Sequence, residues 1–553
     1  MTVLPEQLAR LFFLPIGRER LQNKRANSSV EILCSSKLAN ASATRALIDC
    51  FFACTGTLFY IVSPEEAGEL FRAVYMDEEG PTKASLGAIC AIACVASQYD
   101  ETTIDHSVRQ SYYETAKFYL DDCIEEDEVL GMRVLCLLSI YCAMDKRLTA
   151  WTWILTGLKL ARLRGIHLER RPASTSPKEW VSQKKVLRTL IFLASWLSAS
   201  LGSNPEIMAA FQPVFEESFV VAEDDPSVES LVQEQMTSIG VLTTGVLKDV
   251  FLKEQLSVVA TREHKLKLAD WVRRIPAAMQ LDSLTKNKAL TSNQRRSVFL
   301  VHVNYMGALL LLYRRHLFYL ATTHRDVPWQ LDGDMTEAMG YAEDAVATAL
   351  QSARLLHLLM SERAIFKRCW LIIYQSFSAC TVLLFHVAQK RLHGAGPAEY
   401  DEELSHSKSC LDTLEYCSQG DIVAKGYHDM LHFYYNALNT PPVDACNGTG
   451  ERLQHTEAFG HTTMHTLASH GGSLHPNDLV NRVGGILNWP YQHGWPSDRH
   501  EIISSVDGTN IFSELGFEPH ITFASTTGLY YDSPVFGGPF QWSANSVPPP
   551  SRA

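Results

Sequence analysis

One repeating pattern dominates the chain between residues 43 and 437. Apolar side chains recur every three or four positions, and no stretch alternates apolar and polar residues over the length of a strand. Residues at the first spacing share one face of an α-helix, whereas alternating residues share one face of a sheet. Segments 87–97 and 129–144 are apolar on almost every side, so we expect them near the centre of the fold. The pattern predicts an all-α fold built around one large multi-helix domain.

Signals for helix boundaries support this prediction. Pro64-Glu65-Glu66 is typical of a first helical turn, where proline fits and acidic side chains face the positive end of the helix dipole. The spacing predicts an amphipathic helix over 107–124 and the longest helix over 294–322. Residues 205–235 are acidic and contain prolines, which favours a loop there.

Composition divides the chain into three parts, namely a flexible segment over 1–42, the helical domain over 43–437 and a tail over 438–553. The first part contains a basic patch, which is either a nuclear-import signal, the remnant of a linker or a solvated helix face. Its basic residues are Arg18, Arg20, Lys24 and Arg25. The patch is compatible with a nuclear location and does not establish it.

The tail differs from the rest of the chain in charge and in apolar content. Residues 441–553 have no lysine, four arginines and ten acidic residues, which gives a net charge of −6. Glycine, serine, threonine, histidine and proline are frequent, and aromatic residues are scattered. Such a segment has little contiguous apolar surface to offset the entropy of ordering, so we expect it to be mostly disordered. It could be an activation segment or a plain tail.

The overall charge and the cysteines exclude several classes of protein. The chain has 553 residues and a formal net charge of −12, which argues against a surface that coats nucleic acid. Its thirteen cysteines include no Cys-x-x-Cys pair, so we expect buried free thiols and neither a zinc finger nor a redox motif. Charged residues are expected to interrupt every apolar run before the roughly 18 residues that a membrane-spanning helix needs. We therefore expect no membrane partner.

Two neighbouring segments contain the most specific motifs. The first, 151–171, reads WTWILTGLKLARLRGIHLERR, and the second, 184–205, reads KKVLRTLIFLASWLSASLGSNP. Together they resemble the central regulatory region of fungal binuclear zinc-cluster transcription factors, known as the middle homology region. In that family one helix ends in a Leu-Gly-Leu-His-like turn, and the next begins with a basic pair and ends at Gly-Arg-Pro. The matching positions are Trp153, Gly157, Lys159, Ala161, Gly165, His167, Lys184, Lys185, Gly202 and Pro205.

This chain also departs from the family pattern in the second segment. Arg188 stands where tryptophan is expected after the basic pair, and Ala194-Ser195-Trp196 replaces the usual Asp-Arg. The closing Gly-Arg-Pro is Gly202-Ser203-Asn204-Pro205. The resemblance therefore depends on the order and spacing of several motifs, and extends over roughly 43–437.

The resemblance implies a nuclear transcription regulator that acts on a specific pathway, such as a gene cluster of secondary metabolism. The partners that it implies are the transcription machinery or a partner transcription factor, together with a small-molecule effector. The six-cysteine zinc cluster that gives the family its DNA binding is not in this sequence. Zinc and DNA are expected only if an upstream coding segment supplies that cluster. Otherwise the helical domain would act through partner proteins.

An enzyme and a passive helical scaffold are the alternatives. Asp121-Asp122-x-x-Glu125 resembles the first magnesium motif of all-α class I terpene cyclases, because carboxylates on one helix face suit that ion. No second magnesium triad accompanies it, and no phosphate-binding loop or nucleophile elbow is found. We therefore expect no catalytic, cofactor-binding or metal-ligating residue. His167 is expected to be a structural residue that a helix dipole favours in its charged form.

Overall fold

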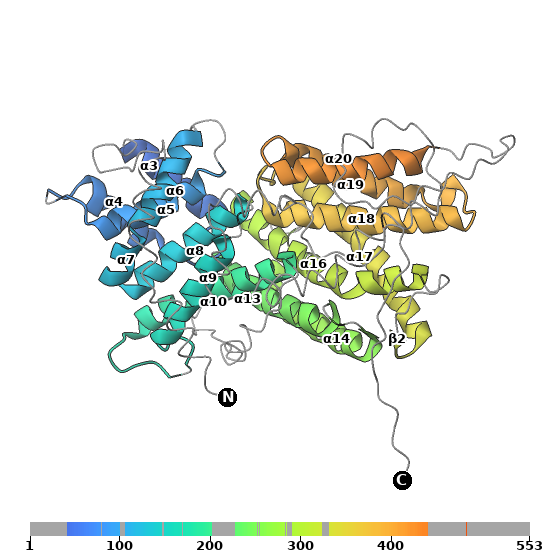
Figure 1. Cartoon of the computed structure of the whole chain (residues 1–553), viewed down its shortest axis with the longest axis horizontal. Coiled ribbons are helices and arrows are strands. Elements are labelled where there is room, and N and C mark those ends of the chain that lie inside the picture. The colour runs from blue at the N-terminus through green and yellow to red at the C-terminus, as the bar shows by residue number, and fades with distance from the viewer. Residues whose placement is uncertain are drawn as a thin grey trace, which may run out of the picture.

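The structure is a computed structural model that describes residues 41–78, 80–99, 106–145, 147, 149–168, 170–201, 227–251, 253, 255–281, 284, 290–322, 331–440 and 483. Fifteen α-helices make up nearly all of these residues, which confirms the all-α prediction. The helices form two halves that lie side by side, drawn in blue to teal and in green to orange in Figure 1. The basic patch of the first segment and the acidic tail lie outside the described residues.

The N-terminal half contains eight of these helices. They are α3 (Ala41–Cys54), α4 (Pro64–Tyr75), α5 (Lys83–Ala96), α6 (His106–Phe118), α7 (Leu120–Glu126), α8 (Glu128–Met144), α9 (Thr149–Leu163) and α10 (Pro177–Leu201). Helices α5 and α8 are central, because nearly all their side chains are buried. This burial confirms the position expected from the apolar segments 87–97 and 129–144.

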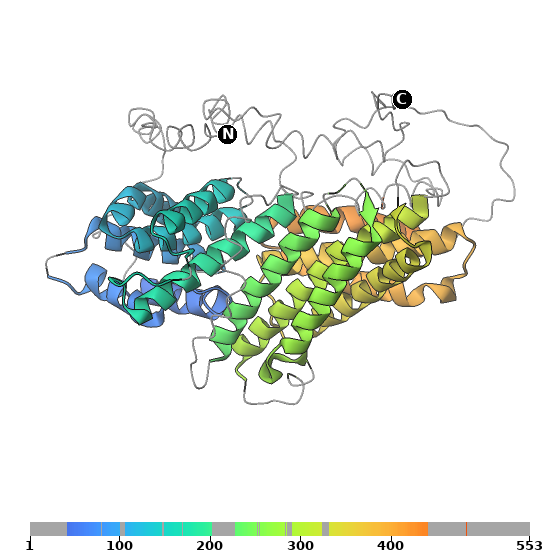
Figure 2. The ribbon, with the colours of Figure 1, turned by 90° about the horizontal axis from the view of Figure 1, so that it is seen from below.

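The C-terminal half contains the other seven. They are α13 (Val228–Val246), α14 (Val258–Arg274), α16 (Ser292–Thr322), α17 (Met335–Ser361), α18 (Trp370–Leu392), α19 (Asp401–Ser418) and α20 (Ile422–Asn439). Two short strands, β1 (Leu256–Ser257) and β2 (Leu331–Asp332), form one parallel pair. Helices α13, α14 and α16 lie beside one another and form the green part of Figure 2.

Side chains that cap helices fix several boundaries. Helix α4 begins at Pro64, as predicted, and Ser63 forms a capping box with Glu66 before it. Asp127 ends α7 and caps α8, because its carboxylate accepts hydrogen bonds from two backbone N–H groups of the first turn. Asp421 caps α20 in the same way. These caps satisfy backbone donors that no preceding turn can satisfy.

Three expectations about helix positions and apolar runs were wrong. The helix expected over 107–124 breaks at Tyr119, where α6 gives way to α7. Residues 228–235, which were assigned to a loop, begin α13, because Ser227 caps the helix and the apolar residues that follow have helical spacing. The expectation that charged residues interrupt every apolar run fails at α18, whose first twenty residues include no aspartate, glutamate, lysine or arginine.

Two helices, α16 and α18, are long and apolar enough, by length and composition, to cross a membrane. In the bundle, 78% of the apolar window of α16 and 94% of that of α18 are buried against other helices. The central helices of a large helical bundle have the same composition. The apolar character of both helices is therefore explained by their place in the core.

Candidate functional site

The first motif ends in a turn that only glycine adopts easily. Gly165 has a φ of 69° just after α9. The Ile166 N–H donates to the Ala161 carbonyl at 2.9 Å, and the Gly165 N–H donates to the Arg162 carbonyl at 3.0 Å. This pair of bonds is the Schellman arrangement, which closes a helix and turns the chain sharply. Fully buried Ile166 then anchors the turn in the core.

The basic pair of the second motif has two different structural roles. Lys184 is only 2% exposed, and its Nζ donates to the Leu168 carbonyl at 2.6 Å. The same ammonium lies 4.9 Å from the centre of the Trp180 ring. Lys185 is half-buried and reaches the other half of the molecule, where its Nζ donates to Ser230 Oγ at 3.3 Å. The Lys184 bond therefore joins the second motif to the end of the first.

The small residues of the first motif allow α9 and α10 to approach closely. A Cβ atom at Gly157 would lie 2.9 Å from one δ-carbon of Leu190 and 3.0 Å from the other. Ala161, one turn later, is fully buried. Both positions leave no room for a larger side chain without moving one of the helices.

The other motif residues make less specific contributions. Trp153 and Lys159 are half-buried on α9, and burial lowers the pKa of Lys159. Gly202 and Pro205 lie outside the described residues. His167 is half-buried in the turn after α9.

The surroundings of His167 disfavour its charged form. Burial is the main cause that lowers the pKa of His167, and the positive charges of Arg162 and Lys184 lower it further. A hydrogen bond with the backbone of Ala161 acts in the opposite direction.

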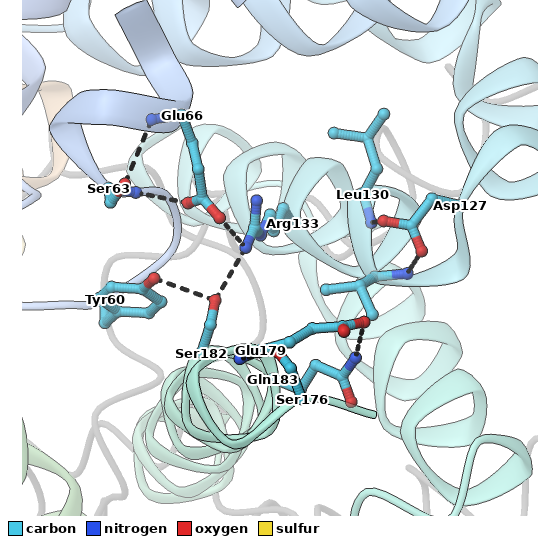
Figure 3. Close-up of polar contacts among 11 residues, drawn as sticks. Tyr60, Ser63, Glu66, Asp127, Leu130, Arg133, Ser176, Glu179, Ser182 and Gln183 are labelled. Carbon is cyan, nitrogen blue, oxygen red and sulfur yellow. Dashed lines mark hydrogen bonds and ion pairs between the residues drawn. The ribbon is translucent and has the colours of Figure 1, made fainter. Parts of the chain in front are cut away.

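Polar contacts connect α10 to the other helices of its half, as Figure 3 shows. Arg133 on α8 forms an ion pair with Glu66 on α4 at 2.6 Å and donates to Ser182 Oγ on α10 at 2.9 Å. The Ser182 hydroxyl also lies 3.0 Å from the hydroxyl of Tyr60. These contacts fix the start of α10 relative to α4 and α8.

A cavity of about 50 Å³ lies where the two halves meet. Helix α10 contributes one wall, and helices α13, α16 and α18 contribute the others. Its aromatic and polar lining residues are Phe192, Trp196, Thr243, Asn304, Tyr374 and Gln375. None of the described residues that line it has an acidic or basic side chain. Its position between the halves makes it the best-formed candidate for a binding site in the described part of the chain.

Glycines create part of this space. A Cβ atom at Gly240 on α13 would lie 2.9 Å from Cδ2 of Phe192. A Cβ atom at Gly307 on α16 would lie 3.0 Å from Oε1 of Gln375. Sequence reasoning missed this cavity. The available signal was the presence of Asn304 and Gln375, together with these glycines, inside otherwise apolar helices.

Aromatic side chains surround the cavity and cross from one half to the other. The Trp196 ring centre on α10 lies 4.0 Å from that of Trp370 and 5.2 Å from that of Tyr374, both on α18. Phe59 and Phe192 pack at 4.8 Å beside them. Because ring pairs of this kind are tightly packed, a change in the cavity is expected to alter how α10 lies against α18.

The acidic motif does not assemble a metal site in the described residues. Asp121 is exposed on α7, a helix of only seven residues, and Asp122 lies 3.5 Å from the ammonium of Lys83. Glu125 lines a shallow surface depression beside Arg164, which forms an ion pair with Glu128 at 3.2 Å. Among the described residues, no three histidine, cysteine or acidic side chains are placed to hold a metal ion.

The described cysteines are free and, apart from half-buried Cys50, they are buried. Burial raises the pKa of the Cys90 and Cys94 thiols, and it raises the pKa of Cys123 to about 12. A thiol that stays protonated is a poor nucleophile and a poor metal ligand. These residues therefore pack as small apolar side chains, as the sequence predicts.

Comparison with known proteins adds no further assignment to this geometry. No model of a known protein family matches this chain, and no curated protein matches it in sequence. The resemblance of the 151–205 region therefore stays a prediction.

Proposed function

We propose that this protein is a nuclear transcription regulator whose helical domain corresponds to the regulatory region of fungal zinc-cluster factors. The supporting observation is the hydrogen bond from Lys184 to the Leu168 carbonyl, which joins residues of the two motifs. Gly157 and Gly165 support the same proposal, because each has a steric or backbone reason to be glycine.

In this proposal the helical domain regulates transcription through partner proteins, and it binds DNA only if a zinc cluster is joined to it. The buried α9–α10 pair holds the N-terminal half together, and the aromatic contacts around Trp196 transmit its position to the C-terminal half. Control of a particular pathway, such as a secondary-metabolite gene cluster, is the finer form of the proposal.

A tethering experiment tests the proposal. The full chain, fused to an unrelated DNA-binding domain, is expected to enter the nucleus and to change the output of a reporter gene. A Gly157→Leu fusion is expected to lose this effect, because the substitution separates α9 from α10. Gly68→Ala is the matched control, since no atom lies within 4 Å of a Cβ at that helical glycine.

Two further arms distinguish the alternatives. A fusion without residues 441–553 is expected to lose activation if that segment activates transcription, and to keep its effect if the helical domain alone recruits the partner. Exclusion from the nucleus, or a reporter that ignores the intact fusion, would contradict the proposal. Mapping the 5′ end of the transcript then shows whether a coding segment with six cysteines precedes this chain.

A further inference from the structure

We propose that the cavity between α10, α13, α16 and α18 binds a small, neutral molecule that presents hydrogen-bond donors, such as an aromatic amine. The inference deepens the proposed function, and its regulatory meaning rests on that function. The binding itself follows from the polar groups in the cavity wall, from the volume and from the charge of the lining.

The nitrogen atoms of the two amide side chains in the wall are both engaged. Asn304 Nδ2 donates to the Leu300 carbonyl at 2.8 Å and also lies 3.6 Å from Met236 Sδ. Gln375 Nε2 uses one of its two N–H groups to donate to Ser352 Oγ at 2.8 Å. The first partner is a carbonyl, which can only accept. The second is a hydroxyl that already donates to the Thr348 carbonyl. These partners fix which atom of each amide is nitrogen.

The oxygen atoms of the same amides are therefore the groups left for a ligand. Within the described residues, no hydrogen bond reaches Asn304 Oδ1 or Gln375 Oε1. Both oxygens belong to residues that line the cavity, and both keep some accessible surface. A small molecule in the cavity can therefore reach them. The Thr243 hydroxyl donates to the Ile239 carbonyl at 2.8 Å and keeps only acceptor capacity. The three oxygen atoms consequently select for donors, and the second N–H of Gln375 is the only donor of these three side chains for which no bond within the described residues is shown.

The volume of the cavity and the charge of its lining restrict the kind of ligand further. The cavity of about 50 Å³ is smaller than the roughly 150 Å³ that holds a benzene ring, so it accommodates a small donor group while the rest of the ligand extends toward the opening. None of the described lining residues carries a carboxylate, and a buried ammonium ion without a counter-charge would be strongly disfavoured. An uncharged N–H or O–H group attached to a flat ring satisfies both conditions. The rings of Phe192, Trp196 and Tyr374 provide the apolar contact.

Binding at this position would affect both halves. Phe192 and Trp196 belong to α10, whereas Tyr374 and Gln375 belong to α18. A ligand that contacts these helices stabilises one arrangement of the halves, by an amount set by its difference in affinity for alternative arrangements. In a transcription regulator, such a ligand would be the effector.

The test compares aniline with toluene on the full-length protein. The two molecules have similar shapes, but only aniline presents N–H donors, and it is uncharged at neutral pH. We expect aniline to raise the melting temperature saturably and to change tryptophan fluorescence through Trp196, with toluene binding more weakly. Gln375→Met and Asn304→Leu are each expected to weaken aniline binding about fivefold, the effect of one lost hydrogen bond, and to strengthen toluene binding.

Gln183→Met is the matched control, because Gln183 is a buried glutamine of α10 that donates to Glu179 at 3.0 Å outside the cavity. It is expected to leave the affinity for aniline unchanged. Equal binding of aniline and toluene to the unmodified protein would overturn the proposal, since the cavity would then be a plain apolar void. The absence of any shift with either molecule would also overturn it. Both measurements need no reporter gene, so they can fail while the proposed regulatory function stands.

Discussion

The two halves of the molecule bury polar groups of different acid–base character. In the described part of the N-terminal half, the buried polar groups are mainly thiols, hydroxyls and paired cations such as Lys184. The C-terminal half also buries the histidines His264, His302 and His316. Burial is the main cause that lowers the pKa of each of these histidines. The described part of the C-terminal half therefore contains buried histidines that acid can charge, whereas the titratable His167 and Asp145 of the N-terminal half are only half-buried.

The largest effect on stability is expected from a substitution that disturbs the packing of the N-terminal half. Gly157→Leu places a large side chain where even a Cβ meets Leu190 at 2.9 Å. We expect a loss of about 3 kcal/mol in the free energy of unfolding, as for other overpacked sites. Chemical denaturation monitored by circular dichroism measures this loss. Hydrogen exchange should show faster exchange in α9 and α10 than in α19 and α20.

Gly68→Ala is again the control, and it should increase stability by about 1 kcal/mol, because alanine favours the helix and nothing obstructs its side chain. If Gly157→Leu were as stable as the unmodified protein, the close approach of α9 and α10 would be wrong. If α19 and α20 exchanged as fast as α9, the halves would unfold as one unit.

Acid is expected to destabilise the C-terminal half through its buried histidines. The pKa of His316 is lowered to about 4, first by burial and then by the positive charge of Arg315. Glu337 and Tyr341 of α17 and Thr261 of α14 also face this ring. The unfolded state takes up a proton near the ordinary pKa of 6.5, whereas the folded state does so only near 4.

Keeping His316 neutral therefore costs no stability above pH 6.5. As the pH falls from 6.5 toward 4, the free energy of unfolding is expected to decrease by up to about 3 kcal/mol, because only the unfolded state takes up the proton. Denaturation at several pH values should show this fall, and His316→Phe should flatten it because phenylalanine cannot be protonated. An unchanged slope in His316→Phe would assign the acid response to other groups.

A smaller effect distinguishes the two lysines of the basic pair. Lys184→Met removes a charge-assisted bond to the Leu168 carbonyl and should cost about 2 kcal/mol. Lys185→Met removes a partly solvated contact with Ser230 and should cost only a few tenths of a kcal/mol. Thermal unfolding of the two variants side by side checks the difference. Equal losses would contradict the separate structural roles of the two residues.

The smallest expected change in stability concerns the cavity between the halves. Gly307→Ala places a methyl group 3.0 Å from Gln375 Oε1 and should weaken aniline binding at least about fivefold. The melting temperature should change little, since the helix-favouring effect of alanine offsets the tight contact. Gly340→Ala, at an open position of α17, should raise the melting temperature and leave aniline binding unaltered. Unweakened binding in Gly307→Ala would place the site elsewhere.

Much of the fold was predictable because apolar spacing is a local property of the sequence. The positions of α4, α8 and α18 follow from spacing and from the residues that begin them. The break at Tyr119 was not predictable, because it depends on a neighbouring helix: a Cβ at Gly87 on α5 would lie 3.0 Å from Cβ of Tyr119. The start of α13 was missed because the acidic residues of 205–235 favoured a loop, although the apolar residues from 228 onward have helical spacing.

The candidate site was predictable only in part. The α9–α10 motifs identified residues that the structure brings together, such as Lys184 and the turn at Gly165. Their sequence could not show that Lys184 is buried and Lys185 half-buried, since that depends on α13 and on the turn before α10. The cavity is formed by four helices that lie far apart in the sequence, so no local pattern predicts it.

The composition of α18 has a consequence for how this protein is made. Its first twenty residues include no aspartate, glutamate, lysine or arginine and are almost completely enclosed, partly by α19 and α20. Both of these helices follow it in the chain, so the ribosome exposes α18 before the residues that cover it, up to Asn439, have been synthesised. During that interval the segment offers the same apolar surface as a membrane anchor to the factors that survey nascent chains. The order of the helices therefore leaves α18 without its full cover until α20 is complete, and we expect a chaperone to bind the segment in that interval.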